Sequence, residues 1–318
     1  MVHLSAGEQS RMSTRVKLLV GHRNGRFPYS NCLLLESASR TVLVDSGCGA
    51  ELIANIKNKI DAVVYTHIHP DHIIYHELLG SVKTIIPEYD CQYRTLQELA
   101  KRFAPPIWRE WINYVDRVFG LHSVPNPTEC FKGWDVIRVG DIEITAIPAT
   151  GHTKGHHVFV IEDHVHVSDI DLTGFGPWYG HPESSLTGFI SDIDLVSRLE
   201  GRWFTTSHKE VVYDREGFLE ALTEFRRSLC RQIVNVARHL HESGSWFKPK
   251  ELINKKLIYI KKIEVAEAVM DYFEYEIIWK ILDYLVSIGI VSRSKRGYRF
   301  NGTVGELWEK CTKYIIKL

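Results

Sequence analysis

One short segment carries most of the residues of this chain that could do chemistry. It follows the apolar run Ala62–Tyr65 and reads Thr66-His67-Ile68-His69-Pro70-Asp71-His72. His67 and His69 are two residues apart, so they point the same way in an extended chain, and Pro70 suits the first position of a helix. Asp71 and His72 then lie on the first helical turn, where the helix dipole favours an ionised carboxylate. Three imidazoles and a carboxylate therefore converge, which predicts a metal site.

Further ligands must come from elsewhere, because one metal ion takes about four ligands and two ions take more than this segment supplies. In open α/β sheets such groups collect at strand ends. Spacing alone does not decide between Asp169 and Asp171, and His181 is a further histidine that could reach the same cleft. The three strand ends that carry suitable groups are Gly151-His152-Thr-Lys-Gly155-His156, Ser168-Asp169-Ile-Asp171 and Ser207-His208.

The elements that must position these groups follow from the pattern of apolar residues. Up to about residue 210, short β-branched runs alternate with turn signals and helical patterns, which is typical of layered α/β structure. A helical, aromatic stretch at 88–121 interrupts the strands. We expect ten strands, at Val16–Val20, Cys32–Glu36, Thr41–Asp45, Ala62–Thr66, Lys83–Pro87, Asp135–Val139, Ile142–Ile147, Val158–Glu162, Val165–Ser168 and Trp203–Thr206.

The C-terminal part of the chain has a helical pattern. A long helix is expected from about Asp214 to Ser243. Beyond it, Glu251–Ile260, Ile263–Phe273 and Glu274–Ile288 predict three short helices, and 291–300 predicts two strands about a basic turn. Three helices closed by a hairpin are the winged-helix pattern, which we expect at about 250–300.

The composition is that of an ordinary globular protein. Its 318 residues are 44% hydrophobic, and 39 Lys and Arg balance 39 Asp and Glu, so the net charge gives no general footprint for nucleic acid or an anionic membrane. No apolar run approaches the ~20 residues that cross a bilayer, and the first 15 residues lack the apolar core of a signal peptide. We therefore expect a cytoplasmic protein without a membrane partner. The six cysteines form no C-x-x-C pair and are expected to be isolated thiols.

With these residues in this order, the chain resembles the metallo-β-lactamase-fold superfamily of metallohydrolases. The resemblance covers roughly Arg15 to His208, and its most specific element is the His-x-His-x-Asp-His signature. It implies an α/β fold, namely an αββα sandwich over residues 1–213, with 88–121 as a helical insertion and a dinuclear metal cleft at one edge of the sheets. The helical region 214–318, with its winged-helix-like part, follows this catalytic domain.

The resemblance also implies a role for each candidate residue. His67, His69 and His152 would hold the first metal ion, and Asp71, His72 and His208 the second. Asp169 would bridge the two, although Ser168 stands where the family usually has Gly before this Asp, which keeps Asp171 open as an alternative. Behind the ligands, Asp45 would order the metal loop and His156 is expected as a second supporting residue; Asn31 matches a family Asn at a strand start.

Two divalent ions, zinc by default with Fe or Mn as alternatives, lower the pKa of bound water to about 7. A metal-bound hydroxide, oriented by Asp71, would then attack the substrate at neutral pH. The sequence therefore predicts a metal-dependent hydrolase. Mononuclear-iron oxidation of sulfur substrates, found in a minority of the superfamily, and a regulator with a vestigial site are less favoured alternatives.

Two substrate classes remain. The neutral charge favours a small ester, thioester or lactone, as in the glyoxalase II branch, whereas the winged-helix-like tail suggests a nuclease or phosphodiesterase acting on single-stranded RNA. Arg293, Lys295, Arg296 and Arg299 concentrate positive charge on the predicted wing. The expected helix 274–288, however, carries one Lys and three acids, which suits packing or a homodimer better than nucleic acid. We therefore favour the small-molecule substrate, with nucleic-acid binding left open.

Overall fold

Two β-sheets form the centre of the molecule in the computed structural model, which describes residues 14–244, 246–253, 255–261 and 263–311, together with 313 and 315. All ten expected strands are present within one or two residues of their expected bounds, and β6, a three-residue strand, was not predicted. The first sheet has the order β1 (Arg15–Leu19), β2 (Cys32–Glu36), β3 (Thr41–Val44), β4 (Ala62–Val64), β5 (Lys83–Pro87) and β6 (Glu129–Phe131). The second sheet has the order β11 (Trp203–Thr205), β10 (His164–His166), β9 (His157–Ile161), β8 (Ile142–Pro148) and β7 (Val136–Val139).

The alternation of side chains along the strands builds the layers. Leu33 and Leu35 of β2 point into a core between the two sheets, together with Ile144 of β8. Their neighbours Cys32 and Leu34 point the other way, into a core shared with the helices on the outer face of the first sheet. A third core packs helices on the outer face of the second sheet. These three cores are the αββα sandwich, because a strand with period-two alternation can bury both of its faces only when each is covered.

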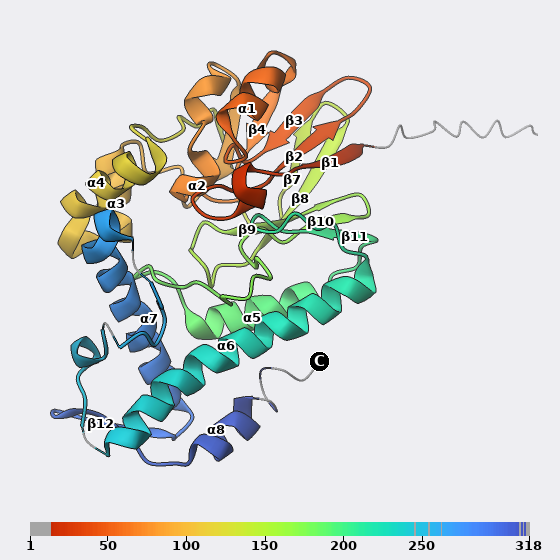
Figure 1. Cartoon of the computed structure of the whole chain (residues 1–318). Coiled ribbons are helices and arrows are strands. Elements are labelled where there is room, and N and C mark those ends of the chain that lie inside the picture. The colour runs from red at the N-terminus through yellow and green to blue at the C-terminus, as the bar shows by residue number, and fades with distance from the viewer. Residues whose placement is uncertain are drawn as a thin grey trace, which may run out of the picture.

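Helices cover both outer faces, and Figure 1 shows α5 and α6 lying side by side beneath the second sheet. Asp214 caps the N-terminus of α6 by accepting a hydrogen bond from the backbone N–H of Gly217 at 2.8 Å, and Gly244 ends this helix in a left-handed conformation. The stretch 88–121 contains the helices α3 and α4. The helices are α1 (Ala50–Ile56), α2 (Pro70–Ile73), α3 (Leu96–Phe103), α4 (Trp108–Phe119), α5 (Leu186–Ser197), α6 (Arg215–Ser243), α7 (Glu267–Ser287) and α8 (Val304–Cys311).

The C-terminal region differs from the prediction of three short helices, which is wrong. Residues 249–252 and 264–266 form only single 3-10 turns, and α7 runs unbroken through the expected boundary at 273–274. The reason is local: no Gly or Pro interrupts this stretch, and Val269, Phe273, Ile277 and Ile281 recur every four residues on one buried face. The hairpin of β12 (Val291–Ser294) and β13 (Gly297–Phe300) is present as expected. A winged helix remains a prediction.

Helix α7 connects the two halves of the fold. In Figure 1 it runs from α3 and α4 down past α6. Its first turns place Val269 and Phe273 in the core beside the first sheet, and its later turns place Ile277 and Ile281 in the core beside the second. The C-terminal region therefore packs against both halves of the sandwich.

Two cysteines depart from the expectation of isolated thiols. Cys91 and Cys130 form a disulfide, with 6.3 Å between their Cα atoms. They are 39 residues apart in sequence but lie on or next to the neighbouring strands β5 and β6, a proximity that no spacing rule reveals. The other four cysteines are free and buried. Among the described residues, no helix has the length and apolar character needed to cross a membrane.

Candidate metal centre

The metal loop follows β4 and is held in place by the neighbouring strand. Asp45 comes directly after β3, where its φ of 59° puts it in the left-handed region that Asp and Asn tolerate best among non-glycine residues. One carboxylate oxygen of Asp45 accepts the backbone N–H of Thr66 at 2.8 Å, and the other accepts the Thr66 hydroxyl at 2.9 Å. The same second oxygen accepts Nδ1–H of His72 at 2.8 Å. Asp45, wholly buried, thus fixes both ends of the loop.

The structure brings all seven candidate ligands together in two adjacent groups. Within each group the ligand atoms lie within 4.8 Å of one another. Oδ2 of Asp169 lies 3.1 Å from Nε2 of His152 in the first group, and Oδ1 lies 3.0 Å from Nε2 of His72 in the second. The two oxygens of Asp169 therefore face opposite groups. The first group is His67, His69, His152 and Asp169, and the second is Asp71, His72 and His208.

Several donor atoms of the two groups are buried without a hydrogen-bond partner among the described residues, which suits metal ligands. Nε2 of His67 is buried and forms no hydrogen bond with the residues that the structure describes. The same is true of Nε2 of His72 and Oδ1 of Asp169, which lie 3.0 Å apart but do not meet the geometry of a hydrogen bond. Buried polar atoms without partners are costly, and a cation placed among their lone pairs would satisfy them together. Nitrogen and carboxylate donors in two adjacent groups are the set that zinc and related divalent ions take.

Each ligand imidazole has its other ring nitrogen occupied, which fixes the tautomer that faces the cluster. Nδ1–H of His152 donates to the carbonyl of Trp178 at 2.9 Å, and Nδ1–H of His208 donates to the carbonyl of Gly25 at 2.8 Å. His72 is bound by Asp45, as described above, and Nδ1 of His67 lies 3.1 Å from the Thr66 hydroxyl. These partners leave the ligating nitrogens directed at the shared space.

The protonation states of the first group agree with a ligand role. Burial, with nearby imidazoles, lowers the pKa of His67 and of His69 well below the usual histidine value, so both rings are neutral donors. Burial acts to raise the pKa of Asp169, but His72 and His208 outweigh it and hold this pKa well below the usual range. In the second group, burial acts to lower the pKa of His72 and of His208, but the Asp169 carboxylate outweighs it and raises both pKa values. Burial raises the pKa of Asp71, although the neighbouring His72 and His208 act to lower it.

Two further residues support Asp169 from behind. Nδ1–H of His156 donates to the carbonyl of Ala149 at 2.7 Å, and its Nε2 accepts the backbone N–H of Asp169 at 3.1 Å. Burial, and next His152, lowers the pKa of His156 to about 3, so this ring stays neutral. Ser168 has a φ of 47°, which explains why glycine suits this position, and its hydroxyl donates to that of Thr66 at 3.0 Å.

Asp171 has a different environment from Asp169. Its carboxylate accepts the backbone N–H of Thr173 at 3.0 Å and the Thr173 hydroxyl at 3.2 Å, and it belongs to neither group of ligand atoms. The geometry therefore favours Asp169 over Asp171 as the bridging carboxylate.

His181, which the sequence left open, lies beside the first group. Its Nδ1 is 3.0 Å from Nε2 of His69, and its ring stacks on Phe103 with 4.0 Å between centroids. Since Nδ1 of His69 lies 2.8 Å from Nε2 of His152 in the cluster, Nε2 of His69 carries the proton and donates to His181. Burial lowers the pKa of His181 well below its usual value, which keeps it a neutral acceptor.

A buried ion-pair network, which sequence reasoning missed, holds the loop that carries His152. The guanidinium of Arg102 on α3 lies 2.6 Å from Asp90 and 2.6 Å from Glu183, and it donates to the Thr153 hydroxyl at 3.0 Å. A Cβ on Gly155 would lie 2.2 Å from both carboxylate oxygens of Asp90, so only glycine fits there. The partners of Arg102 lie 12 to 81 positions away from it in sequence, and no local pattern signals these contacts.

The two ligand groups open into a chamber of about 370 Å³. Its walls are mainly apolar and come from α4, from the loop 174–181 and from the C-terminal region. Arg26 is the one lysine or arginine among the described residues that line it, and its side chain is exposed. Cavities of this size and character are typical of small-molecule sites.

Comparisons with known proteins agree with this geometry. The sequence model of the metallo-beta-lactamase superfamily matches residues 25–208. An uncharacterized protein of Aquifex aeolicus is 30% identical over 130 residues, which are 39% of this chain and 56% of that protein, so the match spans little more than half of the relative's length.

Two solved structures share the fold over nearly the whole chain. A metallo-beta-lactamase family protein of Thermus thermophilus superposes with a TM-score of 0.64 at 19% identity, covering 91% of this chain and 98% of that one. A beta-lactamase domain protein of Burkholderia ambifaria gives a TM-score of 0.62 at 15% identity, covering 90% and 91%. With the two sheets, the outer helices and the paired His and Asp groups in place, the chain belongs to the metallo-beta-lactamase superfamily.

Proposed function

We propose that this protein is a metal-dependent hydrolase that holds two divalent metal ions, zinc by default, and cleaves a small ester, thioester or lactone. His67, His69 and His152 would hold the first ion, Asp71, His72 and His208 the second, with Asp169 between them. The two opposed oxygens of Asp169 support this division. When bound, the ions would lower the pKa of a bound water to about 7 and would supply the positive charge that stabilises a developing oxyanion.

The residues of the chain have separable tasks in this proposal. Asp71 lines the chamber as well as the second ligand group, so its carboxylate can accept a hydrogen bond from the attacking water and orient it. Asp45 and His156 keep His72 and Asp169 in position through the hydrogen bonds described above. The apolar walls exclude bulk water, which strengthens each electrostatic interaction inside.

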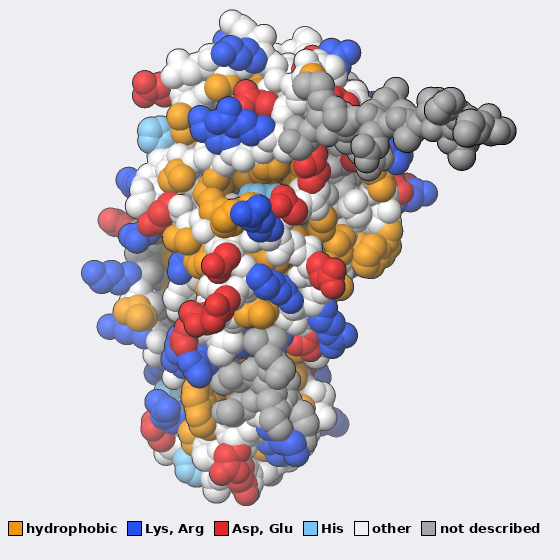
Figure 2. Space-filling model, turned by 90° about the vertical axis from the view of Figure 1, so that its right-hand side faces the viewer, with side chains coloured by type: hydrophobic (Ala, Val, Ile, Leu, Met, Phe, Trp, Pro, Cys, Tyr) orange, Lys and Arg blue, Asp and Glu red, His pale blue; other side chains and the backbone are white. Residues whose placement is uncertain are grey.

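The chamber is the observation that favours a small molecule over RNA. Proteins that track a nucleic-acid backbone line their grooves with several Lys and Arg, whereas the described lining of this chamber includes one such residue, Arg26. On the face shown in Figure 2, basic and acidic side chains are interspersed and form no continuous basic field. A phosphodiester would therefore find the metal ions but little charge for its flanking phosphates.

The test is a substrate panel combined with metal analysis. Purified protein is assayed with a thioester, a lactone, a bis-phosphodiester and a short RNA, and its bound metal is measured. We expect turnover of a thioester, ester or lactone and about two divalent ions per chain. His67→Ala should lose both the turnover and the bound metal. His164→Ala is the matched control, because His164 is also a buried imidazole but binds Thr205, outside both ligand groups.

Two results would contradict the proposal. Turnover of RNA with a steep salt dependence, and none of the small substrates, would favour the nuclease instead. Full activity of metal-depleted His67→Ala would show that hydrolysis does not depend on the metal ions.

A further inference from the structure

The chamber beside the metal centre has walls from three distant parts of the chain. One wall is α4, the second is the loop 174–181, and the third comes from residues 259–273 of the C-terminal region. The family match ends at residue 208, so the third wall lies outside the part of the chain that defines the family. The aromatic and apolar residues that line the chamber include Trp111, Tyr114, Phe175, Trp178, Met270 and Phe273.

The third wall is fixed to the second by specific contacts. Tyr259 accepts a hydrogen bond from Nε1–H of Trp178 at 2.7 Å, and its ring stacks on Phe175 with 5.9 Å between centroids. Phe273 of α7 meets Trp178 edge to face at 5.2 Å and His181 at 5.1 Å. Aromatic pairs in these geometries attract one another more than burial of their surface alone would explain. These contacts therefore hold the third wall against the second and fix the shape of the chamber.

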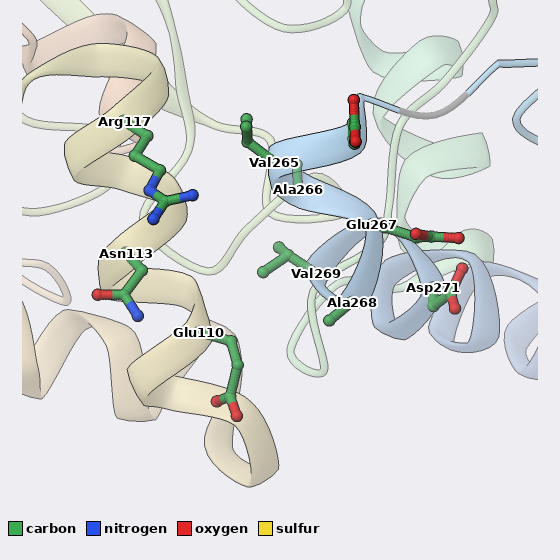
Figure 3. A pocket seen from close by; sticks show the side chains of 10 residues that line it. Glu110, Asn113, Arg117, Val265, Ala266, Glu267, Ala268, Val269 and Asp271 are labelled. Carbon is green, nitrogen blue, oxygen red and sulfur yellow. The ribbon is translucent and has the colours of Figure 1, made fainter.

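The apolar side of this wall faces the metal centre, and the polar side faces outward. On the outer side, α4 and the first turns of α7 border a groove of about 520 Å³, where Figure 3 shows Asn113 and Arg117 of α4 facing Val265 and Val269. Glu110, Glu264 and Glu267 also line this groove. Met270 and Phe273, from the same turns of α7, line the inner chamber instead. The helix therefore separates a charged groove from an apolar chamber.

The chamber offers few partners for a charged substrate group. Apart from the histidines and carboxylates of the metal centre, the ionisable groups on its walls are Asp171, His181, the exposed Arg26 and the hydroxyls of Tyr114 and Tyr259. Tyr114 forms no hydrogen bond with the residues that the structure describes, so its hydroxyl is free to bind a polar atom of a ligand. An anionic group buried among these rings would lose its hydration, and the exposed Arg26 is the one lysine or arginine among the described lining residues that could offset this cost.

From this arrangement we infer that the chamber binds an uncharged apolar group of the substrate, an aryl ring or an alkyl chain of several carbons, next to the bond that is cleaved. Helix α7 supplies the specificity through Met270 and Phe273. This inference rests on the proposed function, since it names the class of ester, thioester or lactone that the site accepts. It excludes substrates whose group in this position is anionic.

Two series of thioesters test the inference, one with the apolar group on the acyl side and one with it on the thiol side. In each series the group grows from methyl through butyl to benzyl, and an anionic carboxyethyl member is included. Each buried methylene is worth roughly fourfold in binding, so we expect kcat/KM to rise by more than tenfold along at least one series. The anionic member should be the poorest substrate. A flat response in both series, or a preference for the anionic member, would overturn the inference.

A binding measurement separates this inference from the proposed chemistry. N-Benzylhexanamide, which carries no charge and no labile ester, is titrated into the protein while its tryptophan fluorescence, to which Trp111 and Trp178 of the chamber contribute, is followed. Saturable binding is expected even if every ester tested fails to react. Absence of binding in a protein that hydrolyses small esters would refute the apolar chamber and leave the hydrolase intact.

Variants in α7 identify the wall that is responsible. Phe273→Ala should flatten the chain-length series and weaken the amide about tenfold or more, and Met270→Trp, which fills the chamber without removing a buried side chain, should exclude the benzyl member through KM. Ile260→Ala is the matched control, because Ile260 lies in the same region, is 76% exposed and does not line the chamber. Unchanged preferences in both α7 variants, or an equal change in the control, would contradict the role of α7.

Discussion

Asp45→Asn is the sharpest single test of how the metal loop is held. The wild-type carboxylate accepts three hydrogen bonds, from the Thr66 N–H, the Thr66 hydroxyl and Nδ1–H of His72. Asparagine has the same shape and tolerates the φ of 59° at this position, so the backbone needs no adjustment. It has, however, one acceptor oxygen and one NH₂ group. Whichever way the amide turns, one buried N–H of Thr66 or His72 then faces another donor.

The expected magnitude follows from that count. A buried donor left without an acceptor costs about 1–3 kcal/mol, which corresponds to roughly five- to 150-fold in an equilibrium constant. Losing the partner of a ligand histidine lowers metal affinity by about 10- to 100-fold in known sites, so the two estimates agree. We therefore expect metal affinity to fall about 10- to 100-fold in Asp45→Asn, with the overall fold retained.

The measurement is competition for zinc against a chromophoric chelator, with far-ultraviolet circular dichroism to confirm folding. Asp61→Asn serves as the control, since Asp61 also binds a backbone N–H, that of Thr41 at 2.7 Å, at the other end of the same pair of strands and away from the site. Unchanged zinc affinity in a folded Asp45→Asn protein, or an equal loss in Asp61→Asn, would show that Asp45 does not position the ligands.

Three further predictions concern the surroundings of the site. Asp169→Asn should lower bound metal and abolish hydrolysis, whereas Asp171→Asn should keep its metal, as measured by elemental analysis; the reverse result would move the bridging role to Asp171. His181→Phe keeps a ring to stack but removes the acceptor for His69, so zinc affinity should fall about tenfold and recover in part in His181→Asn, which restores an acceptor; equal affinities in the two variants would argue against this role. Burial raises the pKa of Asp192 from 3.8 to about 6, so its ionised form destabilises the fold at neutral pH. That penalty disappears as pH falls from about 6 to about 4, and melting curves of Asp192→Asn should lack this contribution; an identical pH profile in wild type and variant would refute it.

Local patterns in the sequence predicted most of the fold, because alternation and helical spacing act over a few residues. The ten expected strands are present, and α6 begins one residue after the expected Asp214 and ends at the expected Ser243. The misses have physical reasons. Strand β6 has three residues, two of them exposed, and so offers no apolar pattern, and α7 continues through a boundary that no Gly or Pro marks. The Cys91–Cys130 disulfide depends on the neighbouring positions of β5 and β6, which pairing of the strands decides.

The candidate site also has one part that local sequence predicted and another that only tertiary packing decides. The spacing of His67, His69, Asp71 and His72 is sufficient by itself to bring three imidazoles and a carboxylate together, because a strand end and one helical turn determine their directions. The sequence could name His152, Asp169 and His208 as candidates from their places after strands. Packing of the two sheets turns Asp169, rather than Asp171, toward both groups. Contacts such as His181 with His69, 112 residues apart, and the chamber wall from α7 exist only because the layers close on one another, and no periodicity along the chain encodes which distant side chains meet there.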